Sequence, residues 1–283
     1  MIKMSDINDN EIRIVGADSG NGRKKHIPWW VWVLVGIFVV ALVLLLLYPK
    51  SNGPDQLNVS GDTLPPDSTS QYNVWRGHPS VTDVSDTLID NIHLRILTPY
   101  NAVPELHVGR LDTADTDIIL AAMAADIRRD NGKIVGAYVL AGEPLSWGLS
   151  KKGYCAIIDG CITIGVADNS PLFEQATEQG GYFFRQYAAV DNGVMVQNNP
   201  QNASFRRALC SLHGNVCVVI STDRILMDDF SAALVKLGVT DAILLVGGSA
   251  DGWCRVEDGS LISFNSNYLK NAEYLNYIVF RKQ

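Results

Sequence analysis

The stretch Asp241–Trp253 reads DAILLVGGSADGW, and it decides how the second half of this sequence is interpreted. Its apolar run, Ala242–Val246, is short and rich in residues that favour β-structure, so it predicts a buried strand. Gly247 and Gly248 follow at once, and glycines at a strand end permit a sharp turn or the close approach of a ligand. Asp251 then adds a carboxylate. The stretch therefore predicts a core strand that ends in either a tight turn or the floor of an active site.

Short β-rich segments alternate with turn residues on both sides of that stretch. We expect strands at residues 133–140, 154–158, 161–166, 182–190, 194–197, 204–212, 216–222 and 274–282. Helical signals occur at residues 169–181 and 227–238, and residues 112–132 are typical of either a helix or a buried segment. Asp159-Gly160 is the strongest short hairpin signal in the chain. These patterns predict an α+β fold, a mostly antiparallel or mixed β-sheet with a few interspersed helices.

Residues 27–48 carry no charge and are almost entirely apolar. A helix of that length would span ~33 Å, enough for the hydrocarbon core of a bilayer. A cleaved signal peptide is the alternative, but its apolar region usually has only about 7–15 residues. We therefore expect one transmembrane helix before the α+β domain.

Basic residues set the expected orientation of that helix. Arg13, Arg23, Lys24 and Lys25 precede it, whereas only Lys50 follows it closely. This asymmetry places the N-terminus in the cytoplasm and the main domain in the periplasm or another extracytoplasmic space. The expected parts are a cytoplasmic tail at 1–26, the helix at 27–48, a flexible tether at 49–72 and an exported domain at 73–283.

Charge and cysteine content exclude some functions. The formal net charge of −7 disfavours a nucleic-acid partner, which would require a basic face. The five cysteines match no zinc pattern, so no metal site is predicted, and no cofactor can be inferred. Their simplest interpretation is as small buried apolar residues. A bridge between Cys155 and Cys161 is compatible with the spacing but not implied by it.

Charged residues inside apolar strands are the candidates for a site. Arg185 lies in YFFRQYAAV, and Arg206 and Arg207 lie in SFRRALCSL. Each arginine either faces water from an exposed sheet face or holds a phosphate or carboxylate in a cleft. Asp126, in MAADIRRDNG, and Asp251 are either solvated carboxylates or general acids and bases.

The order of these segments resembles that of the phosphodiester glycosidase family. The segments run GKIVGAYVLAGEPLSWG, GYCAIIDGCITIG, GGYFFRQYAAVDNG, RRALCSLHGNVCVVIST, LVKLGVTDA and ILLVGGSADGW, and the resemblance covers about residues 121–253. Arg206 and Ala208 match the family's Arg-x-Ala strand. Gly247, Gly248 and Ser249 match the family's last glycines and serine.

Two positions depart from the family pattern. Val246 stands where the family has an aspartate before its glycines, although Asp251 follows five residues later. The family's I-N-G-G-F-F segment is replaced by MAADIRR, in which Asp126 is the polar residue nearest that point. The carboxylate expected at the glycine turn is therefore missing.

The resemblance implies a membrane-anchored envelope hydrolase that cleaves a glycosidic or sugar-phosphate diester bond of an exported glycan. Arg206, together with Arg185 and the turn Gly247–Ser249, would bind the substrate. Asp126 or Asp251 would act as general acid or base. The alternative is a non-catalytic envelope protein that keeps the family cleft and binds a glycan or a protein. The expected partners are a glycan or sugar phosphate and the membrane.

Overall fold

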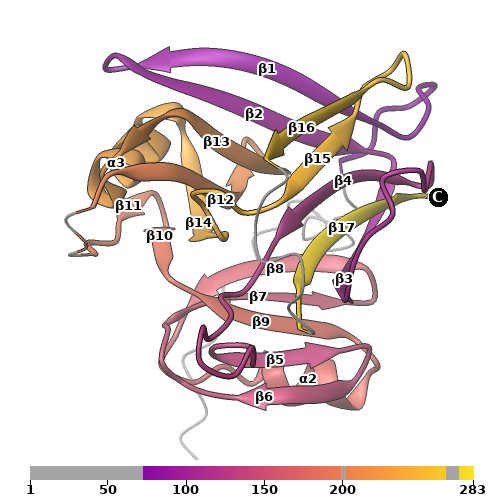
Figure 1. Cartoon of the computed structure of the whole chain (residues 1–283), viewed down its shortest axis with the longest axis vertical. Helices are drawn as coiled ribbons and strands as arrows, with labels where there is room; N and C mark the ends of the chain where they lie inside the picture. Colours follow the sequence, from indigo (N-terminus) through magenta and orange to yellow (C-terminus); the bar gives the residue numbers. More distant parts are fainter. Residues whose placement is uncertain (1–72, 199, 201, 266–273) are drawn as a thin grey trace, which may run out of the picture. The chain divides into compact units, whose positions relative to one another are not determined.

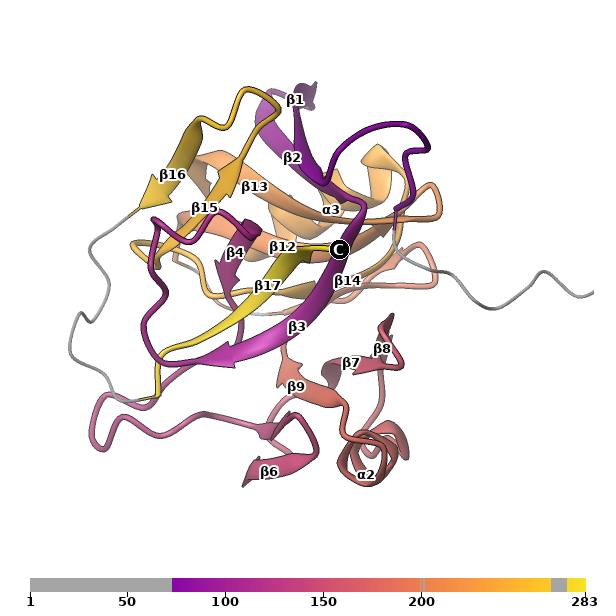
Figure 2. The same cartoon turned by 90° about the vertical axis from the view of Figure 1, so that its right-hand side faces the viewer.

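The computed structural model describes residues 73–198, 200, 202–265 and 274–283 (Figure 1). All of them belong to the second of two compact units, which begins at Thr63. Their strands form three antiparallel sheets, with two short helices lying against them (Figure 2). One apolar core joins the sheets, since it contains Leu209 of the first, Leu120 of the second and Phe184 of the third.

The first sheet has seven strands and contains the predicted strand of the opening stretch. Its spatial order is β1 (Val81–Ile89), β2 (Ile92–Tyr100), β13 (Asn215–Ile225), β12 (Ser204–Leu212), β14 (Val239–Leu244), β10 (Ala188–Asp191) and β11 (Val194–Met195). Helix α3 (Met227–Leu237) covers part of it, because Phe230 and Leu234 are fully buried in a cluster with residues of β12 and β13. The run Ala242–Val246 is buried throughout, as the sequence predicts.

The second and third sheets have five strands each. The second runs β16 (Leu261–Asn265), β15 (Gly252–Arg255), β4 (Ile118–Met123), β17 (Asn276–Lys282) and β3 (Ala102–Val108). The third runs β6 (Glu143–Trp147), β5 (Ala137–Leu140), β9 (Tyr182–Gln186), β7 (Gly153–Ile158) and β8 (Cys161–Val166). Helix α2 (Leu172–Glu178) packs on β5, β7 and β9 of the third sheet, in the lower half of Figure 1.

The expected α+β class is wrong. Strands make up 53% of the described residues and helices 9%, so this part of the chain is mostly antiparallel β-sheet. The ambiguous segment 112–132 contains the strand Ile118–Met123, and every residue of that strand is buried. A strand covered on both faces shows no alternation of apolar and polar residues, and so its sequence cannot be distinguished from a buried helix by period alone.

The expected fold also included one transmembrane helix before the α+β domain. Within the described residues, no helix is long and apolar enough to cross a bilayer. The predicted span at 27–48, the tail at 1–26 and the tether at 49–72 all lie outside the described residues.

One predicted strand is divided in the structure. Residues 182–190 were expected as a single strand, but β9 ends at Gln186 in the third sheet and β10 begins at Ala188 in the first. Tyr187 lies between them, and its carbonyl oxygen accepts a hydrogen bond of 2.8 Å from the N–H of Leu244. The chain therefore passes from one sheet to another at Gln186-Tyr187.

The five cysteines are free thiols, and four of them are buried. Cys155 lies opposite Ile164 and Cys161 lies opposite Ile158, so the bridge that the spacing left open is not formed. Burial raises the pKa of the Cys155 thiol above its ordinary range. The cysteines act as the small buried residues that the sequence favoured.

The predicted hairpin at Asp159-Gly160 is confirmed. Ile158 pairs with Cys161 across the turn, and both turn residues have positive φ, 47° for Asp159 and 76° for Gly160. This combination is typical of the two-residue turns that match the twist of the flanking strands.

Replacing Gly160 with valine is expected to lower the free energy of unfolding by about 1 kcal/mol or more. A β-branched side chain is strained at positive φ, whereas glycine is not. Thermal unfolding of Gly160→Val measures the effect. Thr163→Val, on the exposed face of the same hairpin, is the control and should cost little. Equal melting temperatures for all three chains would contradict the strained turn.

Candidate functional site

A buried lysine lies where the three sheets meet. Lys151 precedes β7, and its side chain is only 4% exposed. Its ammonium donates hydrogen bonds to the carboxylate of Asp126 and, at 2.6 Å, to Oε1 of Gln186. The ammonium also lies 4.9 Å from the centre of the Tyr187 ring. A charge this deeply buried is retained only because these partners compensate its loss of hydration.

Close main-chain contacts hold this cluster together. Gly153 lies opposite Gln186 in the register of β7 and β9, and a Cβ atom at Gly153 would lie 2.6 Å from the Gln186 carbonyl oxygen. Only glycine permits that approach, which places Lys151 beside the end of β9. Asp126 is fixed by its own carbonyl oxygen, which accepts a 2.8 Å hydrogen bond from the N–H of Val135.

The two partners of the ion pair differ in exposure. Lys151 is almost completely buried, whereas the side chain of Asp126 is 40% exposed. Burial lowers the pKa of the Lys151 ammonium, and the neighbouring Asp126 carboxylate partly opposes this. The carboxylate is therefore anchored from the protein side and open to solvent on the other, an arrangement that suits a general acid or base.

The stability of the protein should rise with pH because of Lys151. The pKa of Lys151 in the folded chain lies below 10.5, its ordinary value in the unfolded chain. At a pH between the folded and the unfolded pKa, the unfolded chain therefore binds more protons than the folded chain. The free energy of unfolding is then expected to increase with pH across that interval. Urea unfolding at several pH values should show this increase in the native chain relative to Lys151→Met. Lys152→Met, at an exposed neighbour, should retain it, and an increase that survives Lys151→Met would disprove the assignment.

The glycine turn after β14 connects the first and second sheets. A Cβ atom on Gly247 would lie 2.3 Å from the carbonyl oxygen of Phe205, and Gly248 has a φ of +62°. The N–H of Gly248 donates to the same oxygen at 2.8 Å, and the N–H of Val246 donates to Met123 at 3.1 Å. The glycines are therefore required by a tight turn against β12, and Ser249 is exposed beside them.

Arg207 is the arginine that holds this turn. It is 1% exposed, and its guanidinium donates to the carbonyl oxygens of Ala250 at 2.8 Å, Phe264 at 3.2 Å and Val246 at 3.3 Å. Burial lowers the pKa of Arg207 to about 10, and the charge of Asp251 opposes this shift. From the sequence we expected Arg206 at this turn, but the arginine whose guanidinium contacts the turn is Arg207.

Arg206 points elsewhere, although its main chain lies beside Gly247. Its guanidinium donates to the carbonyl oxygens of Ile225, at 3.2 Å, and Asn202. Asp251 accepts a 2.9 Å hydrogen bond from the N–H of Gly252, and it is partly buried. No hydrogen bond or ion pair among the described residues joins Arg206 or Asp251 to Asp126.

Arg185 supports the buried lysine indirectly. It is 1% exposed, and its guanidinium donates to the carbonyl oxygens of Lys151 at 2.7 Å, Ala167 at 2.8 Å and Asp168 at 3.2 Å. Burial lowers its pKa, and the charge of Asp168 opposes this. Of the predicted site residues, the structure thus brings Asp126 and Arg185 to Lys151, and it places Arg206, Asp251 and the glycine turn in other contacts.

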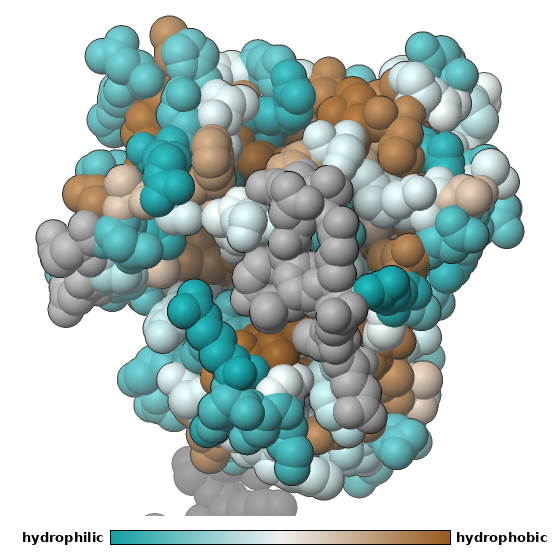
Figure 3. Space-filling view, viewed as in Figure 1, coloured by the Kyte–Doolittle hydropathy of each residue, from teal (hydrophilic) through white to brown (hydrophobic). Residues whose placement is uncertain are grey.

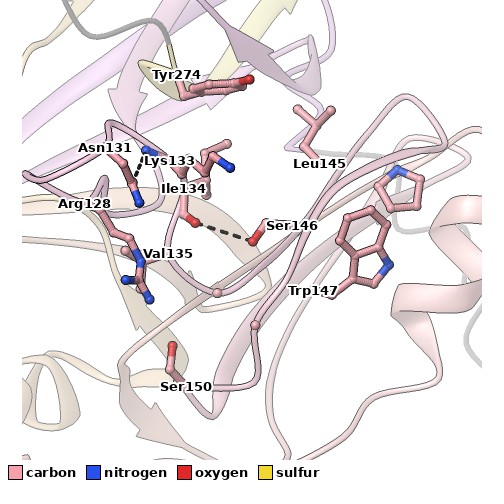
Figure 4. Close-up of a pocket in the computed structure, with 13 residues that line it drawn as sticks. Arg128, Asn131, Lys133, Ile134, Val135, Leu145, Ser146, Trp147, Ser150 and Tyr274 are labelled. Atoms are coloured by element: carbon pink, nitrogen blue, oxygen red, sulfur yellow. Dashed lines mark hydrogen bonds between the residues drawn. The ribbon is translucent and has the colours of Figure 1, made fainter. Parts of the chain in front are cut away.

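A pocket of about 580 Å³ lies beside the main chain of this pair, since its lining includes Ser150 and Val135, whose N–H is bonded to the Asp126 carbonyl oxygen, but neither Asp126 nor Lys151 lines it. Its wall includes Arg128, two residues after Asp126, and Ser150, directly before Lys151. The other lining residues are Asn131, Lys133, Ile134, Val135, Gly136, Pro144, Leu145, Ser146, Trp147, Gly148 and Tyr274 (Figure 4). In Figure 3, hydrophobic surface (brown) lies beside hydrophilic residues (teal) over this lower part of the molecule.

The lining of this pocket has a distinct chemistry. Among the described residues it contains two cations and two aromatic rings but no carboxylate. Nor do the described His, Cys, Asp and Glu side chains gather in any group of three that could hold a metal ion. No sequence signal indicated Lys151, Gln186 or the pocket, because Lys151-Lys152 has the composition of an ordinary solvated surface segment.

The fold is similar to a solved glycosidase structure. The catalytic domain of zebrafish N-acetylglucosamine-1-phosphodiester alpha-N-acetylglucosaminidase, auto-inhibited by its pro-peptide, matches with a TM-score of 0.52 and 14% identity, over 75% of this chain and 86% of that one. A hypothetical protein from Synechocystis matches with a TM-score of 0.47 and 15% identity, over 71% and 62% of the two chains. No protein-family model and no curated protein sequence matches the chain. The resemblance expected from the sequence is thus supported for the fold, as a distant relationship to a glycosidase catalytic domain.

Proposed function

We propose that this domain is a hydrolase that acts on a glycosidic or sugar-phosphate diester bond of a glycan. The observation that carries the proposal is the Lys151–Asp126 pair, a half-exposed carboxylate anchored by a buried ammonium beside a large pocket. The fold similarity to a glycosidase catalytic domain is consistent with this class of reaction.

Asp126 is the proposed proton-transfer group. As a general base it would take a proton from water while the water oxygen attacks phosphorus or the anomeric carbon, and the bond from that atom to the leaving oxygen breaks. The leaving oxygen then takes up the proton from Asp126, directly or through solvent, and the carboxylate is regenerated. Lys151 would hold the carboxylate in place through a charge-assisted hydrogen bond. Glycosidic cleavage usually requires two facing carboxylates, whereas this proposal has a single carboxylate, that of Asp126, beside the pocket. This favours the phosphodiester over the glycosidic bond.

Several residues remain sequence-based candidates within this proposal. Arg206 and the turn Gly247–Ser249 would bind substrate, and Asp251 would be a second acid or base, if the substrate extends to that turn. Arg185 would act through the main chain of Lys151, to which it is hydrogen-bonded, and not through the substrate.

A binding protein without catalysis is the second candidate. Val246 replaces the aspartate of the family pattern, and the described pocket lining lacks a carboxylate. A pocket of this size can bind a glycan without breaking it. Both candidate functions predict that the domain binds a glycan, but only the hydrolase predicts that a bond of the glycan is cleaved.

A hydrolysis assay separates these two functions. The purified full-length chain would be incubated with a panel of sugar-phosphate diesters and of glycosides, and the release of free sugar would be followed. Release that depends on Asp126 supports the hydrolase. Binding without release from any member of the panel would leave the binding protein as the function.

The location of the domain is proposed from the sequence alone. The uncharged segment 27–48 and the basic residues before it favour a single-pass protein with its main domain outside the cytoplasm. Alkaline phosphatase fused after Gln283 would then be active in a bacterial host. A stably expressed but inactive fusion would refute this topology.

A further inference from the structure

Two cations of the pocket lie on the two arms of a short hairpin. Ile127 and Ile134 form an antiparallel bridge, and within it the N–H of Arg128 donates to the carbonyl oxygen of Lys133 at 2.9 Å. The turn closes through Gly132, whose N–H donates to the Arg128 carbonyl oxygen at 2.9 Å. Arg128 and Lys133 are therefore direct cross-strand neighbours, and both line the pocket.

Arg128 and Lys133 are exposed cations at opposite positions of this hairpin. Like charges directly opposite one another destabilise an antiparallel pair. No ion pair joins either side chain to an acidic group in the described residues, although Asp130 lies exposed in the same turn. The chain as a whole carries a net charge of −7, so an uncompensated pair of cations runs against its overall charge. An anion between the two side chains would remove the repulsion.

The far wall of the pocket has different chemistry. Trp147 is 67% exposed, and Figure 4 shows Arg128 and Lys133 on one side of the hollow and Trp147 on the other. Tyr274 also lines the pocket. Exposed aromatic rings present an apolar face with little loss of conformational entropy on binding, and such faces suit the apolar face of a sugar ring.

Polar groups complete the pocket between these walls. Ser146, Ser150 and Asn131 supply hydroxyl and amide groups to the lining. The Ser146 hydroxyl is 3.4 Å from the carbonyl oxygen of Ile134, which ties β6 to the hairpin. A pocket lined by two cations, two aromatic rings and several hydroxyl and amide groups matches an acidic sugar better than a free anion or a neutral sugar.

We propose that this pocket binds a negatively charged sugar residue, with its phosphate or carboxylate between Arg128 and Lys133 and its ring against Trp147. The inference rests on the proposed function in that it names the substrate class of the same site. The binding itself does not require the bond to be cleaved, and it can be measured separately.

Calorimetric titration of the full-length chain tests the proposal. The probes are glucose 1-phosphate, glucuronic acid, glucose and inorganic phosphate, at low salt and at about 1 M salt, where the screening length is about 3 Å. We expect one of the two acidic sugars to bind at least about tenfold more tightly than either glucose or inorganic phosphate. The affinity for that sugar should fall strongly at high salt. The preferred acidic sugar identifies whether phosphate or carboxylate is the bound group.

Matched variants locate the site. Arg128→Gln and Lys133→Gln should each weaken binding of the preferred acidic sugar by about tenfold or more, since a charge-assisted contact is lost. Arg129→Gln removes an exposed neighbouring charge outside the pocket lining, and it should leave binding within about twofold. Trp147→Ala should weaken binding of the sugar but not that of inorganic phosphate.

Several results would overturn the inference. It would be overturned if glucose or inorganic phosphate bound as tightly as both acidic sugars, or if no probe bound. An equal loss of affinity in Arg129→Gln and Arg128→Gln would also overturn the inference, because the effect would then reflect net charge alone. Binding of an acidic sugar without any hydrolysis would keep this inference and overturn the proposed hydrolase instead.

Discussion

Replacing Arg207 with alanine is expected to lower the free energy of unfolding by about 3 kcal/mol or more. The substitution removes the donor of three carbonyl oxygens that fix the glycine turn and the end of β16. It also leaves a cavity beside Phe264, whose ring centre lies 4.9 Å from the guanidinium. Buried carbonyl groups without donors are costly, and here they lie where two sheets are joined.

Arg206 provides the matched control for this prediction. It is the adjacent residue of the same strand and is only partly buried, and it donates to two carbonyl oxygens outside the turn. Arg206→Ala should cost about 1 kcal/mol. Urea unfolding of both variants measures the difference. Equal losses would mean that Arg207 does not hold the turn.

Replacing Asp126 with asparagine is expected to lower kcat/KM by about 10²–10⁴-fold, if the domain is the proposed hydrolase. The amide keeps the size of the side chain and still offers an oxygen to the Lys151 ammonium. It cannot take up or deliver a proton in the reaction. Binding of the substrate should change much less than its turnover, because the pocket lining itself is unaltered.

A control is needed because Asp126→Asn also removes the charge partner of a buried ammonium. Thermal unfolding of the variant shows whether the domain is still folded at the assay temperature. Asp130→Asn removes an exposed carboxylate from the neighbouring turn and should leave turnover unchanged. Full activity in folded Asp126→Asn, with loss in Asp251→Asn, would move the proton-transfer role to the glycine turn.

Local signals in the sequence were sufficient for the turns and helices. Asp159-Gly160 forms the predicted hairpin, and Gly238 ends α3 with a φ of 97°. Both depend on backbone conformations that few residues tolerate, and so they are encoded within a few positions. The apolar run Ala242–Val246 also indicated a buried strand here, but β14 spans Val239–Leu244 and so overlaps only part of that run.

The fold class required more than local signals. Ile118–Met123 is an inner strand that pairs with β15 along one edge and with β17 along the other, and all of its side chains are buried because other parts of the fold cover both of its faces. The segment 182–190 divides at Tyr187 because its two halves find partners in different sheets. Such pairings join residues far apart in the sequence, and the hydrophobic periodicity within one segment does not predict them.

The sequence by itself determined the Asp159-Gly160 turn, most of the strands after residue 133 and which residue types carry charge into the apolar regions. The tertiary structure alone decided which of those charges are buried. Arg207 reaches the turn and Arg206 does not, since adjacent residues of a strand face opposite sides and the register shifts between Phe205 and Arg207. Lys151 is enclosed while the side chain of Lys152 remains 69% exposed. Burial of these side chains depends on how the sheets dock, and this is the physical reason why two neighbouring residues of the same type have different roles.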